Sequence, residues 1–130
     1  MTTDRLASDG SSPLTDIGPV VEVRTYRTKP GRRTEFIEVF QSLGGPAQRA
    51  YGMTVLGPLP DADDADTVVW LRAFPSAAER ERIKAAFYDG PEWKDELEGI
   101  VDPLLAETTV RVCHMPAGFL DGSLRSPSWH

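Results

Sequence analysis

The side chains best suited to chemistry in this chain lie in one short stretch, Val20 to Gly31. Its residues alternate in character as in a β-strand, and a Pro-Gly pair then ends it before a helical pattern begins. One face of this strand carries Glu22, Arg24 and Tyr26, whereas the other carries Val and Thr side chains. An acid, a guanidinium and a phenol in a row form either a solvated surface or a built polar site.

A second predicted strand, Thr67 to Phe74, also has two faces of different character. Alternation places Trp70, Arg72 and Phe74 on one face, opposite small and aliphatic side chains. We expect the aliphatic faces of both strands to pack under helices, so the Trp-Arg-Phe set should share the remaining face with the acid, guanidinium and phenol of the first strand. The same logic adds Arg111 from the last predicted strand.

If this face is a site, its arginines favour an anionic or oxygen-rich ligand, because a guanidinium holds a carboxylate or enolate bidentately and keeps its proton. Glu22, if desolvated, would be the best general base, and Tyr26 could donate to a developing oxyanion. The alternative is a structural Glu–Arg network with a core phenol, since buried charges must be paired. The predicted substrate-binding residues are Arg24, Trp70, Arg72, Phe74, Arg111 and Trp93.

Trp93 belongs to a Phe-Tyr-Asp-Gly-Pro-Glu-Trp motif at residues 87–93. A Gly-Pro hinge flanked by aromatic side chains could form a rim or lid over a cavity. The other interpretation is that the motif separates two helices and packs its aromatic side chains into the core.

The first half of the chain predicts one helix and three strands. Residues 1–19, rich in Ser, Thr, Asp, Gly and Pro, are predicted to be a flexible tail. After the first strand, a helix should start near Gly31 and be interrupted at residues 44–46, before a short turn to Tyr51. Strands at 53–59 and 67–74 should form an antiparallel hairpin around an acidic tip.

The second half predicts a helix, an amphipathic helical piece and a last strand. Ser76 and Glu79 form a capping box, and Gly90-Pro91 ends the helix that they begin. The last strand should cover about residues 108–115, and residues 117–130 form a second tail. The order is βαββαβ, the ferredoxin-like arrangement, which makes residues 20–116 an α+β domain with an antiparallel sheet and helices on one face.

The other face of such a sheet needs a cover, and the chain has no second layer to supply one. Tyr26, Trp70 and Phe74 are expected on this bare face. A second copy of the same sheet is the simplest cover, so we expect a homodimer.

Three separated motifs resemble the NIPSNAP family of the dimeric α+β barrel superfamily. They are VEVRTY followed by KPG within residues 21–31, WLRAFP at 70–75, and FYDGPEWK at 87–94. The resemblance implies a homodimer whose two sheets form a dimeric α+β barrel with a cavity in each subunit. It does not imply one reaction, because the superfamily includes cofactor-free monooxygenases, cyclases, haem-degrading enzymes and proteins that only bind ligands.

The amino-acid composition limits the kinds of partner, metal and cofactor that we expect for this protein. A net charge of −6 argues against nucleic acid and anionic membranes, and no apolar run approaches membrane-spanning length. The single Cys113 excludes an internal disulfide and suits a reducing cytoplasm. With two histidines and an acidic tip that departs from the calcium-loop pattern, we expect no metal and no cofactor.

Two functions remain open. One is a cofactor-free enzyme that acts on a small organic substrate, anionic or polyketide-like, by proton transfer, cyclisation, isomerisation or oxygenation. The other is a non-catalytic ligand-binding or protein-interaction protein.

Overall fold

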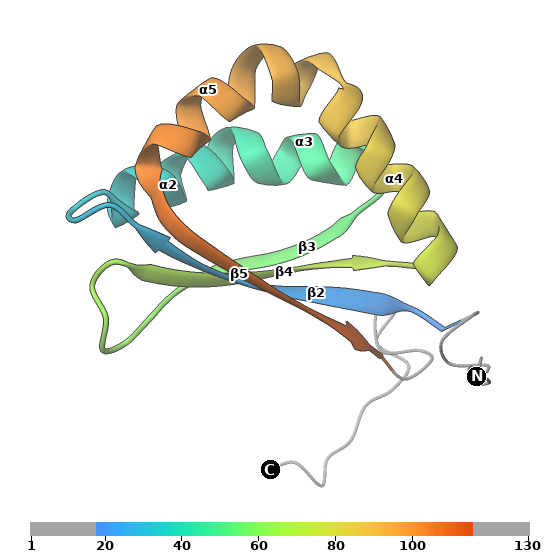
Figure 1. Ribbon diagram of the computed structural model, residues 1–130, viewed down its shortest axis with the longest axis horizontal. Helices are drawn as coiled ribbons and strands as arrows, with labels where there is room; N and C mark the ends of the chain where they lie inside the picture. Colours follow the sequence, from blue (N-terminus) through green and yellow to red (C-terminus); the bar gives the residue numbers. More distant parts are fainter. Residues whose placement is uncertain (1–17, 116–130) are drawn as a thin grey trace, which may run out of the picture.

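Within residues 18–115, a four-stranded antiparallel sheet carries the helices on one face (Figure 1). The computed structural model describes residues 18–115, so nearly all of the two predicted tails, 1–19 and 117–130, lies outside the described residues. Within the described residues the predicted α+β, ferredoxin-like class is confirmed. The sheet order is β3-β4-β2-β5, and its strands are β2 (Val20–Thr28), β3 (Thr54–Pro60), β4 (Thr67–Phe74) and β5 (Leu105–His114).

The first helical segment runs without a break from Arg33 to Ala50. It consists of α2 (Arg33–Val39), a π-helical turn η1 (Phe40–Gly44) and α3 (Gly45–Ala50). The predicted interruption at residues 44–46 is therefore wrong. Pro46 directly follows the π-helical turn η1, where the regular hydrogen-bond ladder of the helix is already altered, so its missing N–H does not end the helix.

The second helical segment begins where the capping pattern places it. The side-chain oxygen of Ser76 accepts a hydrogen bond from the Glu79 backbone N–H at 3.1 Å, and α4 (Ala77–Asp89) follows. Gly90 takes an extended conformation and ends α4, as predicted. The chain then continues through the π-helical η2 (Glu92–Leu97), α5 (Glu98–Val101) and the 3₁₀ turn η3 (Asp102–Leu104).

The register of β2 against β4 pairs Glu22 with Arg72 and Arg24 with Trp70. Side chains of directly opposed residues share a face of the sheet, so the two polar and aromatic sets are on one face, as expected. That face, however, is the one the helices cover: Trp70 and Phe74 belong to the same buried cluster as Phe36 of α2. The predicted orientation of the sheet is wrong.

The helices cover this face of the sheet because its aromatic rings and its charged groups both find partners there. The helices present phenylalanines, which pack well against aromatic side chains of the sheet. The buried charges on this face satisfy one another, so they need no solvent. The aliphatic face is left without any covering helix from residues 18–115, and carries a small cluster of Val21, Ala73 and Met115 with Leu71 and Cys113 against it.

β3 is an edge strand with an irregularity. Its register against β4 shifts between Leu56 and Leu59, and the bulge contains Gly57 and Pro58. Gly57 has a positive φ of 105°, and an added Cβ there would lie 3.1 Å from the Trp70 Cβ. Glycine therefore allows the bulge to approach the strand that carries Trp70.

Candidate ligand-binding cavity

A cavity of about 230 Å³ lies between the sheet and the helices. Its walls combine two guanidiniums with aromatic and aliphatic side chains and a few polar groups. They come from all parts of the fold: Arg24, Tyr26, Phe36, Val39, Phe40, Gly44, Gln48, Trp70, Arg72, Phe87, Tyr88, Trp93, Leu97, Val101, Asp102, Leu105 and Thr108. A concave, mostly apolar space with few polar groups is the usual form of a small-molecule site.

Both helical segments widen into a π-turn where they meet this cavity. Phe40 and Gly44 of η1 line it from one side, and Trp93 and Leu97 of η2 from the other. π-turns occur frequently at functional sites. Here each π-turn brings one aromatic ring, Phe40 or Trp93, to the cavity.

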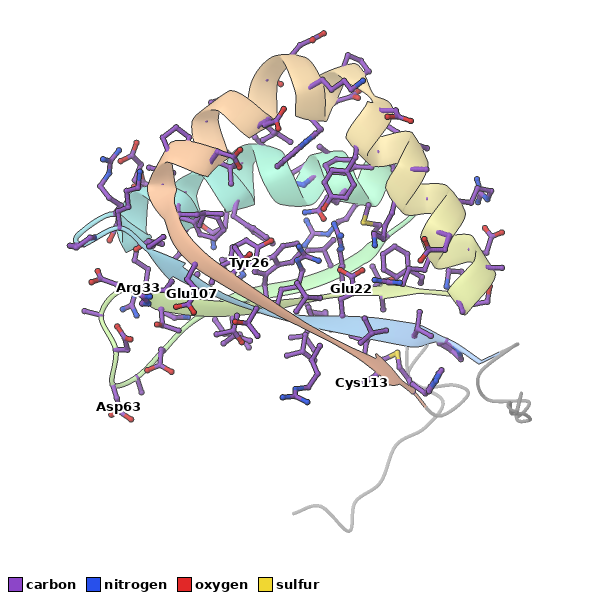
Figure 2. All side chains as sticks on the ribbon, viewed as in Figure 1. Glu22, Tyr26, Arg33, Asp63, Glu107 and Cys113 are labelled. Atoms are coloured by element: carbon purple, nitrogen blue, oxygen red, sulfur yellow. The ribbon has the colours of Figure 1, made fainter. Side chains whose placement is uncertain are left out.

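Glu22 lies behind the cavity wall and accepts hydrogen bonds from three arginines. Its Oε1 accepts from Arg72 Nε at 2.7 Å and also from Arg24 Nη1, while its Oε2 accepts from Arg80 Nε at 2.8 Å. Glu22 is completely buried and is not among the residues that line the cavity. Figure 2 shows its side chain between the sheet and the helices. It is placed to orient the guanidiniums, and they stand between it and the cavity.

The electrostatics of this cluster keep Glu22 ionised. Burial alone would raise the pKa of Glu22, but the charge and hydrogen bond of Arg72, together with Arg24 and Arg80, lower that pKa below its ordinary value of 4.5. Arg80 has a second partner in Glu81 at 2.9 Å, so Arg24 and Arg72 are the two guanidiniums of the wall that share the Glu22 carboxylate. Asp102 of η3 also lines the cavity, so the excess of positive charge is confined to the sheet side of the wall.

Arg24 and Tyr26 form the polar part of the wall. Arg24 Nε donates to the Tyr26 hydroxyl at 3.0 Å, and the Arg24 guanidinium lies 5.2 Å from the centre of the Trp70 ring. Burial raises the pKa of Tyr26, against the lowering effect of Arg24, so the phenol is neutral at pH 7. Because the Tyr26 oxygen accepts from Arg24, its own hydrogen is available to another acceptor.

Five of the eight predicted site residues line this cavity: Arg24, Tyr26, Trp70, Arg72 and Trp93. Glu22 lies behind the wall, and Phe74 is buried in the core, 5.9 Å from the Arg72 guanidinium. Arg111 is in the wrong place for this site. The β2–β5 register pairs it with Val23, on the opposite face of the sheet, and its side chain is exposed. Figure 2 shows Cys113 near the end of β5, two residues further along this strand.

Sequence reasoning missed Gln48 and Arg80. Gln48 Oε1 accepts from Arg72 Nη1 at 2.7 Å, and Gln48 is buried. The sequence spacing of both residues relative to apolar residues could have identified them. Arg80 precedes Ile83 and Phe87 at helical intervals on the apolar stripe of α4, and Gln48 follows Phe40 by eight residues, which places it on the same helical face.

Within residues 18–115, no three or more His, Cys, Asp and Glu side chains gather in a way that could hold a metal ion. Every helix in the same range is too short or too polar to cross a lipid bilayer.

The chain is similar to several solved structures. One is an uncharacterised NIPSNAP-like domain protein from Burkholderia xenovorans, with 25% identity, a TM-score of 0.69, and coverage of 79% of this chain and 89% of that one. Another is a NIPSNAP family protein of unknown function from Agrobacterium tumefaciens, with 21% identity, a TM-score of 0.68, and coverage of 76% and 89%.

A third similar structure carries a different name. It is a putative antibiotic biosynthesis monooxygenase from Nitrosomonas europaea, with 17% identity, a TM-score of 0.63, and coverage of 78% of this chain and 94% of that one. At that identity the likeness concerns the fold alone. No curated protein matches the chain. A model of the NIPSNAP family matches residues 21–113, which include the whole polar cluster of β2 and β4, and the chain therefore belongs to the NIPSNAP family.

Proposed function

We propose that the cavity binds a small organic anion with a flat, conjugated body, and that the protein is a cofactor-independent enzyme acting on it. The observation that carries this proposal is the guanidinium cluster: Arg24 and Arg72 line an aromatic cavity while Glu22 neutralises only part of their charge. An anion is the ligand that such a wall stabilises best. The size of the cavity, about 230 Å³, suits one or two rings, since drug-sized ligands occupy roughly 300–1,000 Å³.

The reaction classes that fit are those that pass through an enolate or phenolate. Tyr26 can donate its O–H to such an oxygen, and Arg24 beside it adds positive charge. Proton transfer, isomerisation, cyclisation and oxygenation of an electron-rich substrate share this intermediate.

The arrangement favours a positioning role for Glu22 over the predicted role of general base. Both of its oxygens accept from guanidiniums, its pKa is lowered, and the arginines separate it from the cavity. A general base must reach the proton that it removes. Glu22 instead fixes the direction in which Arg24 and Arg72 present their remaining N–H groups.

Binding is tested with 2-naphthoate, a two-ring anion, by isothermal titration calorimetry. Arg24→Gln should weaken binding about 10- to 150-fold, the range for a hydrogen bond to a charged group, at a temperature where its melting curve shows the variant to be fully folded. Arg82→Gln is the matched control, because Arg82 is an exposed α4 arginine paired with Glu79. Equal affinity in the parent and Arg24→Gln would contradict the proposed site.

Catalysis is tested separately with phenylpyruvate, an enolisable aromatic acid. The parent should accelerate exchange of its C3 hydrogens with deuterium oxide, followed by proton NMR: solvent or buffer takes the C3 proton, and Arg24 and Tyr26 stabilise the enolate oxygen that results. Tyr26→Phe should slow that exchange while phenylpyruvate still binds. Binding without any acceleration in the parent would favour the second candidate, a non-catalytic ligand-binding protein that uses the same cavity.

We also propose that two chains pair through the aliphatic face of the sheet. The face offers a hollow of about 190 Å³ lined by Val21, Thr54, Leu56, Leu71, Ala73, His114 and Met115. Keeping such a surface in water costs about 25 cal/mol per Å². A second copy presents the same apolar surface, which makes a two-fold pair the simplest cover.

A further inference from the structure

The indole N–H of Trp70 is a hydrogen-bond donor that lacks an acceptor within residues 18–115. Its Nε1–H is buried and has no hydrogen-bond partner among residues 18–115, although Trp70 is only 3% exposed. Buried side-chain donors in native proteins are nearly always paired, and an unpaired one calls for a specific explanation. Trp70 lines the cavity, and a ligand that displaces the side chains now covering Nε1 would supply the missing acceptor.

The rest of the Trp70 side chain is held firmly. Its ring packs edge-on against Phe40 at 4.7 Å and against Tyr26 at 5.6 Å between centroids. The bulge at Gly57 lies against its backbone and Cβ. An indole fixed in this way presents its N–H in one direction and cannot turn to find a partner.

The direction of this donor differs from that of the neighbouring guanidinium. Arg24 lies over the face of the Trp70 ring, 5.2 Å from its centre, whereas an indole N–H points outward in the plane of the ring. One carboxylate held by Arg24 on the ring face is therefore poorly placed to accept from the ring edge as well. Two separate acceptors of the ligand are needed to meet both donors.

We propose, resting on the proposed function of the cavity, that its ligand carries two distinct oxygen functions on one flat conjugated frame. One is an acid group held by Arg24, and the other is a neutral keto or ether oxygen that accepts from Trp70 Nε1–H. Trp70 is then a specificity-determining residue, because a ligand without the second oxygen leaves the indole donor buried and unpaired. A site built around a buried donor discriminates against analogues that lack the matching acceptor.

Three probes of similar size separate the two contacts. Chromone-2-carboxylate has both oxygen functions, 2-naphthoate has only the acid, and chromone has only the neutral oxygens. The parent should bind chromone-2-carboxylate more tightly than either of the others. Trp70→Phe should remove roughly 3- to 10-fold of the preference over 2-naphthoate, the range for one net hydrogen bond, and Arg24→Gln should remove the preference over chromone.

A measurement on the parent protein avoids dependence on the folding of Trp70→Phe. The chain has three tryptophans, so a nitrogen-15 spectrum contains three indole signals, and Trp93→Phe and Trp129→Phe identify the signal of Trp70. Chromone-2-carboxylate should shift the Trp70 indole proton downfield, and 2-naphthoate should not.

The possible results separate a failure of this inference from a failure of the proposed function on which it rests. If 2-naphthoate and chromone-2-carboxylate bind equally well and the Trp70 indole signal stays in place with both, the two-oxygen ligand is wrong while the anion site stands. If neither anion binds the parent at all, the proposed function fails and this inference fails with it.

Discussion

Arg72 donates its Nε–H to Glu22 at 2.7 Å across the β2–β4 pair, and the two side chains are 1% and 0% exposed. This ion pair is the centre of the polar cluster, because Arg24 and Arg80 reach the same carboxylate from β2 and α4. It joins the middle of the sheet to the helical layer. Its removal should therefore affect stability and cavity geometry together.

Glu22→Gln should lower the free energy of unfolding by about 3–5 kcal/mol, since it leaves buried guanidiniums without their counter-charge. Urea unfolding followed by circular dichroism measures the change. Glu79→Gln is the control: Glu79 pairs with Arg82 on the exposed side of α4, glutamine is also accepted at this position of a capping box, and the change should cost no more than about 1 kcal/mol. Equal stability of Glu22→Gln and the parent would show that the cluster contributes nothing to the fold.

The pH dependence of stability follows from the lowered pKa of Glu22. A carboxyl whose pKa is lower in the folded than in the unfolded protein stabilises the fold above its unfolded pKa, near the ordinary value of 4.5. This contribution is lost as the pH falls from there through the folded pKa. The melting temperature of the parent should fall more steeply below pH 4.5 than that of Glu22→Gln, whose other carboxyls are unchanged. Parallel curves would contradict the assigned cause.

Trp70→Ala should cost about 3–5 kcal/mol, the usual range for truncating a buried aromatic side chain. Because Trp70 packs within one subunit, the loss should occur without a change in the state of association measured by sedimentation. Leu59→Ala is the comparison, since Leu59 is 54% exposed on β3 and should change stability by no more than about 0.5 kcal/mol. Dissociation caused by Trp70→Ala alone would place this indole at a subunit interface instead.

Association through the aliphatic face is tested by sedimentation at micromolar concentration. The parent should sediment at twice the 14.3 kDa chain mass, and Leu71→Glu should give the single-chain mass because it places a charge on that face. Leu43→Glu introduces the same charge at an exposed position of the first helical segment and should remain paired. A parent that sediments as a single chain would remove the proposed pairing.

Gly90→Ala should displace the phenol of Tyr51. An added Cβ at Gly90 would lie 2.2 Å from the Tyr51 hydroxyl, which donates to Glu92 at 2.6 Å. The hydrogen bond between Tyr51, the residue that follows α3, and Glu92 of η2 would break, so the melting temperature should fall at least as far as in Tyr51→Phe. A Gly90→Ala variant as stable as the parent would show that Tyr51 rearranges freely.

Much of the fold could be predicted from local patterns. β4 has the bounds predicted for it, β2 begins at Val20 as predicted, and the Ser76 cap begins α4 where expected. These features depend on alternation, capping and turn residues, which are properties of short segments. The continuous helix through Gly44 to Pro46 could not be predicted in this way, because a π-turn depends on what packs against it.

The candidate site was harder to predict because it depends on which face of the sheet the helices cover. Alternation correctly grouped Glu22, Arg24 and Tyr26 with Trp70 and Arg72, but hydrophobicity favoured burying the valine face. Arginines grouped around the Glu22 carboxylate can be buried only if the carboxylate is buried together with them. One member, Arg80, comes from a helix far along the chain, so no short segment reveals the balance of charges.

The bulge and prolines of β3 have a consequence for how copies of this protein can meet. Pro58 and Pro60 supply no backbone N–H, and the shifted register between Leu56 and Leu59 interrupts the regular ladder along this edge. A strand from another molecule would find few donors there to extend the sheet. The irregular edge thus disfavours open-ended, amyloid-like growth from β3, whereas the proposed pairing uses the apolar face of the sheet and ends with two chains.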